Sequence, residues 1–239
     1  CNKSQNQNRD LLNSVKKFYT YGIEVSAGFI VGFDSDDETI FERQFDFIQA
    51  AGISKAMIEL LQALPGTKLY KRLEQENRLC KLSSGIKQDG TINFTPTMDE
   101  QLLINGYKNL IKKAYSPKCY FERINTLLKD YKPANKSYFH KSYIPALIKA
   151  IIILGFFTKG KRYFWALLIK TVLKRPKALS TALMNSLVYI HFDRVFQEAF
   201  DKKENKSPQK KSTPLQPIDQ QCHSKLCPDL DCVVSGSQR

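Results

Sequence analysis

The amino-acid sequence predicts an α/β region that is followed by an all-α region and a disordered tail. Two Gly-Ile steps, at Gly22-Ile23 and Gly52-Ile53, each end a helix-like segment and begin a strand-like one, so this unit repeats after 30 residues. Later apolar runs at 144–157 and 163–173 indicate helices. The segment 201–239 is rich in Lys, Gln, Pro and Ser and poor in large apolar residues, which is typical of disorder.

The first unit begins with a helix and continues into a strand. Asn8 or Asp10 can cap the helix, apolar residues follow at helical spacing, and Gly22 ends it. The apolar run at 23–33 then predicts a strand. The change of spacing at Gly22 therefore places one α–β unit in this part of the chain.

The second unit repeats this order. Ser35 and Asp36 can cap a helix that Gly52 ends. The run at 56–61 predicts a second buried strand, and the residues at 67–79 predict a further helix. Repeated α–β units favour a parallel sheet or barrel.

Two strands do not close a barrel, and a parallel sheet of two strands leaves long edges unpaired. We therefore expect further strands to precede Cys1, so that the chain is the carboxyl-terminal part of a longer enzyme. Pairing of the sheet with another chain is the alternative.

The carboxyl ends of the predicted strands carry residues suited to ligand binding. In a parallel α/β protein ligands bind at this edge, where the following helix presents free N–H groups. Glycines such as Gly28 and Gly32 let a bound molecule approach the backbone closely. Asp34 can either accept a hydrogen bond from a ligand hydroxyl or start a turn with Ser35 and Asp36.

Other side chains allow both a structural and a functional interpretation. Glu59 lies on an otherwise apolar strand, and it either faces the inside of a barrel, where it needs a partner, or faces outward. His191 stands between aromatic residues and is predicted to be a packed core residue, as are Phe164 and Trp165. Arg43 is expected on the solvated face of its helix.

The basic residues are concentrated in one segment without acidic residues. The net charge is +14, and no Asp or Glu occurs between positions 131 and 192. Eleven cations lie there: Lys132, Lys136, Lys141, Lys149, Lys159, Lys161, Arg162, Lys170, Lys174, Arg175 and Lys177. The apolar runs in this segment are shorter than the ~20 residues needed to cross a bilayer. Residues 131–192 therefore predict either peripheral contact with an anionic membrane or a helical cap with a solvated basic face.

No nucleic acid is expected as a partner, because no signature of a nucleic-acid-binding fold accompanies these charges. The six cysteines are scattered and do not indicate a disulfide framework, so we expect a cytoplasmic location, peripheral to a membrane if the basic segment binds one. No metal ligand is assigned. Cys222, His223, Cys227 and Cys232 have gaps wider than those of ordinary zinc sites, and an incidental cysteine-bearing tail is favoured over a zinc site.

Five segments carry a resemblance to a known family. They are Asn2-Lys3-x-Gln5-Asn6-x-Asn8-Arg9-Asp10, Gly28-Phe29-Ile30-Val31-Gly32-Phe33-Asp34-Ser35-Asp36, Ala63-Leu64-Pro65-Gly66-Thr67-x-Leu69-Tyr70, Ile92-Asn93-Phe94-x-Pro96 and Tyr115-Ser116-Pro117-x-x-Tyr120-x-Glu122-Arg123. Over residues 1–96 the chain resembles the later part of the barrel in B12-binding-type radical S-adenosylmethionine (radical SAM) proteins. Residues 97–200 resemble the helical domain of unknown function that follows the barrel in one branch of this group.

The resemblance implies a (β/α) barrel that binds S-adenosylmethionine and a [4Fe–4S] cluster, cleaves the sulfonium reductively and uses a 5′-deoxyadenosyl radical to abstract hydrogen. It also implies a cobalamin-binding domain at the amino terminus of the complete protein. The family holds its cluster in a Cys-x-x-x-Cys-x-x-Cys loop, which this sequence lacks. The chain is therefore expected to supply part of the S-adenosylmethionine pocket and no cluster ligand.

The resemblance assigns cofactor binding to the first strand and to the loop after the second. The residues are Gly28, Ile30, Gly32, Asp34, Leu64, Pro65, Gly66 and Thr67. In the family the strand lies beside the adenosyl moiety and the loop lies near adenine, whereas helix initiation is the structural alternative for the loop. A valine at Gly32 is expected to abolish cofactor binding and to leave the protein folded.

No catalytic residue is assigned by the sequence. The substrate is unknown, and the basic, apolar helices are compatible with a lipid-like molecule. The alternative function is that of a non-catalytic basic helical module which binds a membrane surface or a protein partner.

Overall fold

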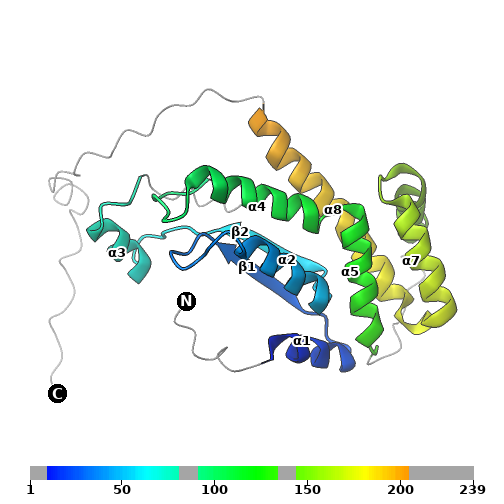
Figure 1. Ribbon diagram of the computed structural model, residues 1–239. Helices are drawn as coiled ribbons and strands as arrows, with labels where there is room; N and C mark the ends of the chain where they lie inside the picture. Colours follow the sequence, from blue (N-terminus) through cyan, green and yellow to red (C-terminus); the bar gives the residue numbers. More distant parts are fainter. Residues whose placement is uncertain (1–9, 81–90, 134–143, 205–239) are drawn as a thin grey trace, which may run out of the picture.

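The described part of the protein is mostly helical and contains one two-stranded parallel sheet (Figure 1). The computed structural model describes residues 10–80, 91–133 and 144–204. The order of its elements confirms an α/β region followed by helices, whereas closure of the sheet into part of a barrel stays a prediction. The predictions for Cys1, Cys222, His223, Cys227 and Cys232 lie outside the described residues.

The elements follow the order that the glycine steps predict. The α/β region consists of α1 (Leu11–Thr20), β1 (Ser26–Val31), α2 (Ile40–Ala51), β2 (Lys55–Leu60) and α3 (Lys68–Gln75). The helical region consists of α4 (Glu100–Ala114), α5 (Pro117–Asp130), α6 (Ile144–Ile152), the π-helical η3 (Ile153–Phe157), α7 (Lys161–Lys174), the 3-10 helix η4 (Pro176–Ala178) and α8 (Leu179–Glu204).

Helix α8 corrects the predicted start of the tail. It continues to Glu204, so residues 201–204 are helical rather than disordered. Lys and Glu are good helix formers, and they extend a helix that has already begun. Residues 205–239 lie outside the described part.

Local capping explains where the first helices begin and end. The Asp10 carboxylate accepts a hydrogen bond from the backbone N–H of Asn13 (2.9 Å) at the start of α1. Gly52 ends α2 in the left-handed conformation, with φ at 70°. The Thr67 hydroxyl accepts a hydrogen bond from the backbone N–H of Tyr70 (3.1 Å) at the start of α3.

Asp36 does not cap α2, contrary to the prediction. Its carboxylate accepts hydrogen bonds from the backbone N–H groups of Gly32 (2.9 Å) and Phe33 (3.0 Å), directly after β1. Helix α2 begins only at Ile40. The two donors at the end of the strand would otherwise lack partners, and an acidic side chain a few residues along the chain satisfies both.

One face of the sheet is covered by helices. Helix α2 lies across it, as Figure 1 shows, and Phe29 of β1 packs edge-on against Phe47 of α2 with 6.2 Å between ring centroids. From α4, the Tyr107 hydroxyl donates a hydrogen bond to the carbonyl of Ile58 on β2 (3.4 Å). The side chains that alternate onto this face are therefore core residues.

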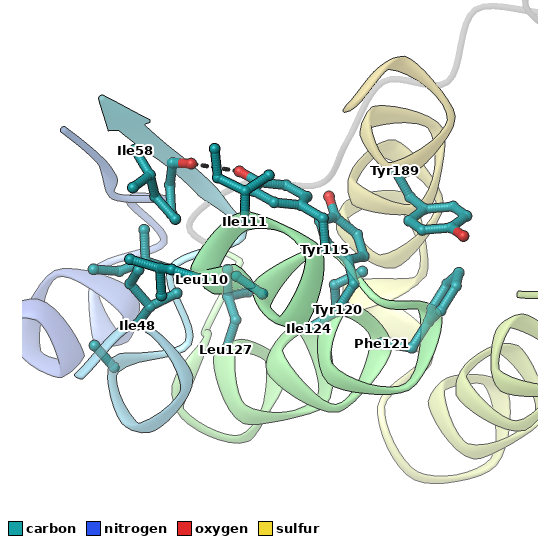
Figure 2. Close-up of a cluster of buried hydrophobic side chains, with 14 of the residues drawn as sticks. Ile48, Ile58, Leu110, Ile111, Tyr115, Tyr120, Phe121, Ile124, Leu127 and Tyr189 are labelled. Atoms are coloured by element: carbon teal, nitrogen blue, oxygen red, sulfur yellow. Dashed lines mark hydrogen bonds between the residues drawn. The ribbon is translucent and has the colours of Figure 1, made fainter. Parts of the chain in front are cut away.

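The core joins the α/β region to the helices in one cluster (Figure 2). Buried side chains of α2, β2, α4 and α5 form its centre, and a group of aromatic rings continues it to α8. Tyr115, Tyr120, Phe121 and Tyr189 form this group, with neighbouring ring centroids 5.3 to 5.9 Å apart. The α/β region and the helical region thus share their apolar interior.

The segment 115–123, which contributes to the family resemblance, connects three elements. The Tyr115 hydroxyl donates a hydrogen bond to the carbonyl of Ala56 on β2, and the Tyr120 hydroxyl donates one to the carbonyl of Asn185 on α8 (2.9 Å). Arg123 is fully buried, and its guanidinium lies 5.2 and 5.0 Å from the ring centroids of these two tyrosines. This part of the motif therefore stabilises the fold.

Two of the aromatic predictions hold and one is wrong. Phe164 is buried, and the half-buried Trp165 packs against the same core. His191 is exposed on α8, so it is not a packed core residue. Consecutive residues of a helix point about 100° apart, so aromatic neighbours in the sequence, such as the buried Tyr189, face another side of the helix.

Candidate functional site

The face of the sheet opposite α2 is open and largely apolar. Gly28 pairs with Met57 and Ile30 pairs with Glu59 in the register of the two strands, so these four residues share this face. The exposed fraction is 43% for Ile30 and 49% for Met57. A Cβ atom added at Gly28 would meet no heavy atom within 4 Å. We call these four residues the open face.

Glu59 supplies the carboxylate of the open face. The sequence left open whether this side chain faces inward or outward, and the register places it on the side of Gly28 and Ile30, away from α2. The ion pairs found among the described residues do not include Glu59.

Gly32 has a structural role that the sequence did not reveal. It is buried and adopts a φ of 105°, a left-handed value that side chains rarely tolerate. A Cβ atom there would lie 3.2 Å from Cδ2 of Leu103 on α4. A valine at Gly32 is therefore expected to destabilise the fold as well as to affect binding, whereas Gly28 is the glycine that opens a surface.

Asp34 is held in a network of positive charges beyond the end of β1. Its Oδ1 atom accepts hydrogen bonds from Arg78 Nη2 (2.7 Å) and Thr97 Oγ1 (2.8 Å), and Oδ2 accepts one from Arg72 Nη2 (2.6 Å). The hydrogen bond from Arg78, followed by the smaller effects of Thr97 and Arg72, lowers the pKa of Asp34 to about 2. The carboxylate thus ties the strand end to α3 and to the segment after it.

The loop at 64–67 is exposed at the end of β2. Thr67 caps α3, which supports helix initiation as its role, and its hydroxyl also donates to the carbonyl of Leu64 (2.7 Å). Leu64 is 48% exposed, and a Cβ atom at Gly66 would meet nothing within 4 Å. Leu64, Pro65 and Gly66 therefore remain available for contact with a ligand.

Asn93, which belongs to one of the five segments that carry the family resemblance, positions this loop, a role that no local pattern predicts. The backbone N–H of Ala63 donates to Asn93 Oδ1 (2.9 Å), and Asn93 Nδ2 donates to the carbonyl of Ala63 (2.8 Å). The side-chain amide of Asn93 thus satisfies both backbone groups of Ala63, as the backbone of a neighbouring strand would do. Asn93 is 1% exposed, so both bonds are shielded from water.

The described residues provide no clustered set of ligands for a metal ion. Among them there is no group of three or more His, Cys, Asp or Glu side chains that could hold a metal ion. Cys80 and Cys119 are free thiols in this part of the chain. Within the same residues, no helix is both long and apolar enough to span a membrane.

The helical region matches a known family. Residues 67–205, more than half of the chain, match the domain of unknown function DUF4070. No solved structure matches the chain.

Curated relatives include enzymes that transfer methyl groups. The chain is 37% identical over 122 residues to an uncharacterized methyltransferase of Synechocystis sp., which covers 51% of the chain and 23% of that protein. It is 32% identical over 121 residues to the hopanoid C-2 methylase of Rhodopseudomonas palustris, and this match covers 51% of the chain and 22% of that protein. It is 30% identical over 77 residues to the bacteriochlorophyllide d C-12(1)-methyltransferase of Chlorobaculum tepidum, and this match covers 32% of the chain and 17% of that protein.

The matched part of the chain thus spans less than a quarter of the length of each of these relatives. The family match and the relatives agree with the resemblance carried by the sequence segments. The chain belongs to the DUF4070 family, whose domain follows the radical SAM domain, and hence to the B12-binding-type radical SAM proteins.

Proposed function

We propose that this chain is the carboxyl-terminal part of a radical SAM methyltransferase, and that its open face forms part of the S-adenosylmethionine pocket. The family match and the names of the three relatives support a methyltransferase. The observation that carries the assignment of the pocket is the open face itself. It is a face of a parallel sheet that carries a glycine and a carboxylate and that the described helices leave uncovered.

Each residue of the open face has a separate role in this proposal. The missing side chain at Gly28 leaves space for the flat adenosine group, and Ile30 and Met57 provide apolar contact beside it. The Glu59 carboxylate attracts the positive charge of the cofactor or accepts hydrogen bonds from its hydroxyl groups. Leu64 and its loop extend the apolar contact beyond the end of β2.

The cofactor brings the chemistry. When bound, S-adenosylmethionine supplies a methyl group and, on reductive cleavage, a 5′-deoxyadenosyl radical. The names of two relatives place the methyl group on a carbon atom, so we propose methylation of a carbon atom in a lipid-like substrate. We assign the ligands of the [4Fe–4S] cluster and the cobalamin site to parts of the enzyme outside the described residues.

The pocket assignment is tested by a valine at Gly28 with a matched control. In the longest natural polypeptide that contains this chain, Gly28→Val should weaken binding of labelled S-adenosylmethionine at least about tenfold in equilibrium dialysis, because a loss of ~1.4 kcal/mol suffices. Ser26→Val places the same side chain on the same face of the sheet, two residues before Gly28 on β1. This control variant should leave the dissociation constant for S-adenosylmethionine unchanged. Equal affinities of wild type and Gly28→Val would remove this face from the pocket.

The reaction class is tested by the products. The anaerobically reconstituted protein should form S-adenosylhomocysteine, which reports methyl transfer, and 5′-deoxyadenosine, which reports reductive cleavage. Sequencing the gene upstream of the codon for Cys1 should show an in-frame Cys-x-x-x-Cys-x-x-Cys loop. A polypeptide with this loop and its cluster that forms neither product would favour the non-catalytic helical module instead.

A further inference from the structure

A second surface, far along the chain from the open face, combines exposed apolar side chains with positive charge. It belongs to α6, η3 and α7, and α7 lies at the edge of the molecule beyond α5 and α8 (Figure 1). We call it the hairpin surface. Its exposed apolar residues are Ile148, Ile152, Phe156, Phe157, Tyr163, Ile169, Val172 and Leu173.

The apolar residues of this surface are unusually accessible for their size. Phe157, at the end of η3, is 80% exposed, and Leu173, near the end of α7, is 76% exposed. Phe156 is 63% exposed and packs edge-on against Trp165 with 6.2 Å between ring centroids. Side chains of this kind gain free energy when they leave water, which favours an apolar partner.

The charges on the hairpin surface all have one sign. Lys149, Lys159, Lys161, Arg162, Lys170 and Lys174 are exposed there. The ion pairs found among the described residues include none of them. The surface therefore suits a partner that is both apolar and negatively charged.

A pocket between α5 and α7 lies beside this surface, and several cationic residues line it. It has a volume of about 220 Å³ and is lined by Asn125, Leu128, Lys129, Lys170, Thr171, Lys174 and Arg175. Four of these side chains are cations, and none of these lining residues is acidic. Arg175 Nη1 donates a hydrogen bond to the carbonyl of Leu128 (2.7 Å), which fixes its guanidinium at the pocket.

We propose that the hairpin surface lies on an anionic phospholipid bilayer and that the pocket between α5 and α7 receives a lipid phosphate. The apolar side chains enter the boundary between headgroups and acyl chains, while the lysines contact the headgroups. A bilayer supplies negative charge and apolar surface at the same place, whereas a nucleic acid would leave Phe157 and Leu173 in water. This proposal does not depend on the reaction that the enzyme performs.

The fluorescence of Trp165 reports contact with lipid, because Trp165 is the single tryptophan of the chain. It lies against η3, where its Nε1 donates a hydrogen bond to the carbonyl of Gly155 (3.0 Å). The whole chain should bind phosphatidylglycerol/phosphatidylcholine vesicles, and brominated lipid should quench Trp165. Vesicles of phosphatidylcholine alone should bind far less. Binding that leaves Trp165 unquenched would overturn the proposal, since another part of the chain would then contact the lipid.

Matched variants separate this surface from the general positive charge of the chain. Lys170→Gln with Lys174→Gln should weaken vesicle binding about 30-fold, because each cation near an anionic membrane contributes about fivefold. The same double change at the exposed Lys68 and Lys71 of α3 should have less than about a threefold effect, because charges away from the contact are screened. Equal losses in the two pairs would contradict the assignment.

The apolar contact has its own pair of variants. Phe157→Ser should weaken binding at least about tenfold, since burial of a Phe side chain contributes ~1.5–3 kcal/mol. Phe18→Ser, at a half-exposed position on α1, should leave binding unchanged. A further outcome would reject the bilayer as partner: tighter binding of a single-stranded oligonucleotide than of the anionic vesicles at the same salt concentration.

Discussion

The glycines of this chain have different structural roles, although they occupy similar positions at the ends of helices and strands. Gly52 and Gly66 both have left-handed φ values, of 70° and 83°. At Gly52 a Cβ atom would lie 2.7 Å from the backbone nitrogen of Leu127 on α5, whereas at Gly66 it would meet nothing within 4 Å. The first glycine permits a close approach between elements, and the second only a turn.

Alanine substitutions should separate these two roles. Gly66→Ala should lower the free energy of unfolding by about 1–2 kcal/mol, the cost of a left-handed conformation. Gly52→Ala should lower it by at least about 3 kcal/mol, because the overlap with α5 adds to that cost. Urea unfolding followed by circular dichroism measures both. Similar losses for the two variants would show that α5 moves away easily.

At the scale of elements, Asp34 connects β1 to α3. Its pKa of about 2 lies below the ordinary value of about 3.9, so its ionised form is stabilised in the folded state. The resulting contribution to stability is fully present above about pH 4 and is lost as the pH falls toward 2.

The pH dependence of an Asp34 variant tests this connection. Asp34→Asn should lower the free energy of unfolding at pH 7, because Arg72 and Arg78 each lose one charged partner and keep only their ion pairs with Glu76. At pH 2, close to the pKa of Asp34 in the folded state, about half of the wild-type side chains are neutral, so the difference between the two proteins should shrink. Urea titrations at several pH values measure it, and a difference that stays constant with pH would contradict the ion pairs.

The contact between α5 and α8 offers a comparison of two buried hydroxyl groups. The Tyr120 hydroxyl donates to the Asn185 carbonyl (2.9 Å), whereas the Tyr189 hydroxyl is buried without a hydrogen-bond partner in the described structure. Tyr120→Phe should therefore lower the free energy of unfolding by about 1 kcal/mol, and Tyr189→Phe should leave it unchanged or raise it. Thermal unfolding measures both, and a larger loss for Tyr189→Phe would reveal a partner for its hydroxyl.

Across the whole molecule, the sequence predicts the features that depend on residues close together along the chain, such as helix ends and the alternation of side chains in strands. Asp10, Gly52 and Thr67 act at helix ends as their chemistry requires. The alternation of side chains along a strand also predicts that Met57 and Glu59 share a face, a signal that could have placed Met57 in the site. It does not show which face the helices cover, because that depends on the packing of α2 and α4.

Contacts between distant residues could not be predicted in the same way. Asp34 meets Arg78 across 44 positions of the chain, and Asn93 meets Ala63 across 30. Neither pair has a local pattern, since a carboxylate or an amide can be satisfied by many partners. The family resemblance named the segments that contain most of these residues, but it gave no reason for Gly32 or Asn93 to be structural.

The aromatic rings between α4 and α8 have a consequence for the dynamics of the protein. The Tyr115 hydroxyl is hydrogen-bonded to β2, and the Tyr120 hydroxyl is hydrogen-bonded to α8. Phe121 packs against Phe164 of α7, with 6.4 Å between ring centroids. These contacts join the elements through one group of rings. Local opening of one of them exposes rings that belong to the next, so amide protons of β2, α5 and α8 should exchange with solvent as one cooperative unit. The α/β region and the helical region should then open to solvent together and not as two independent units.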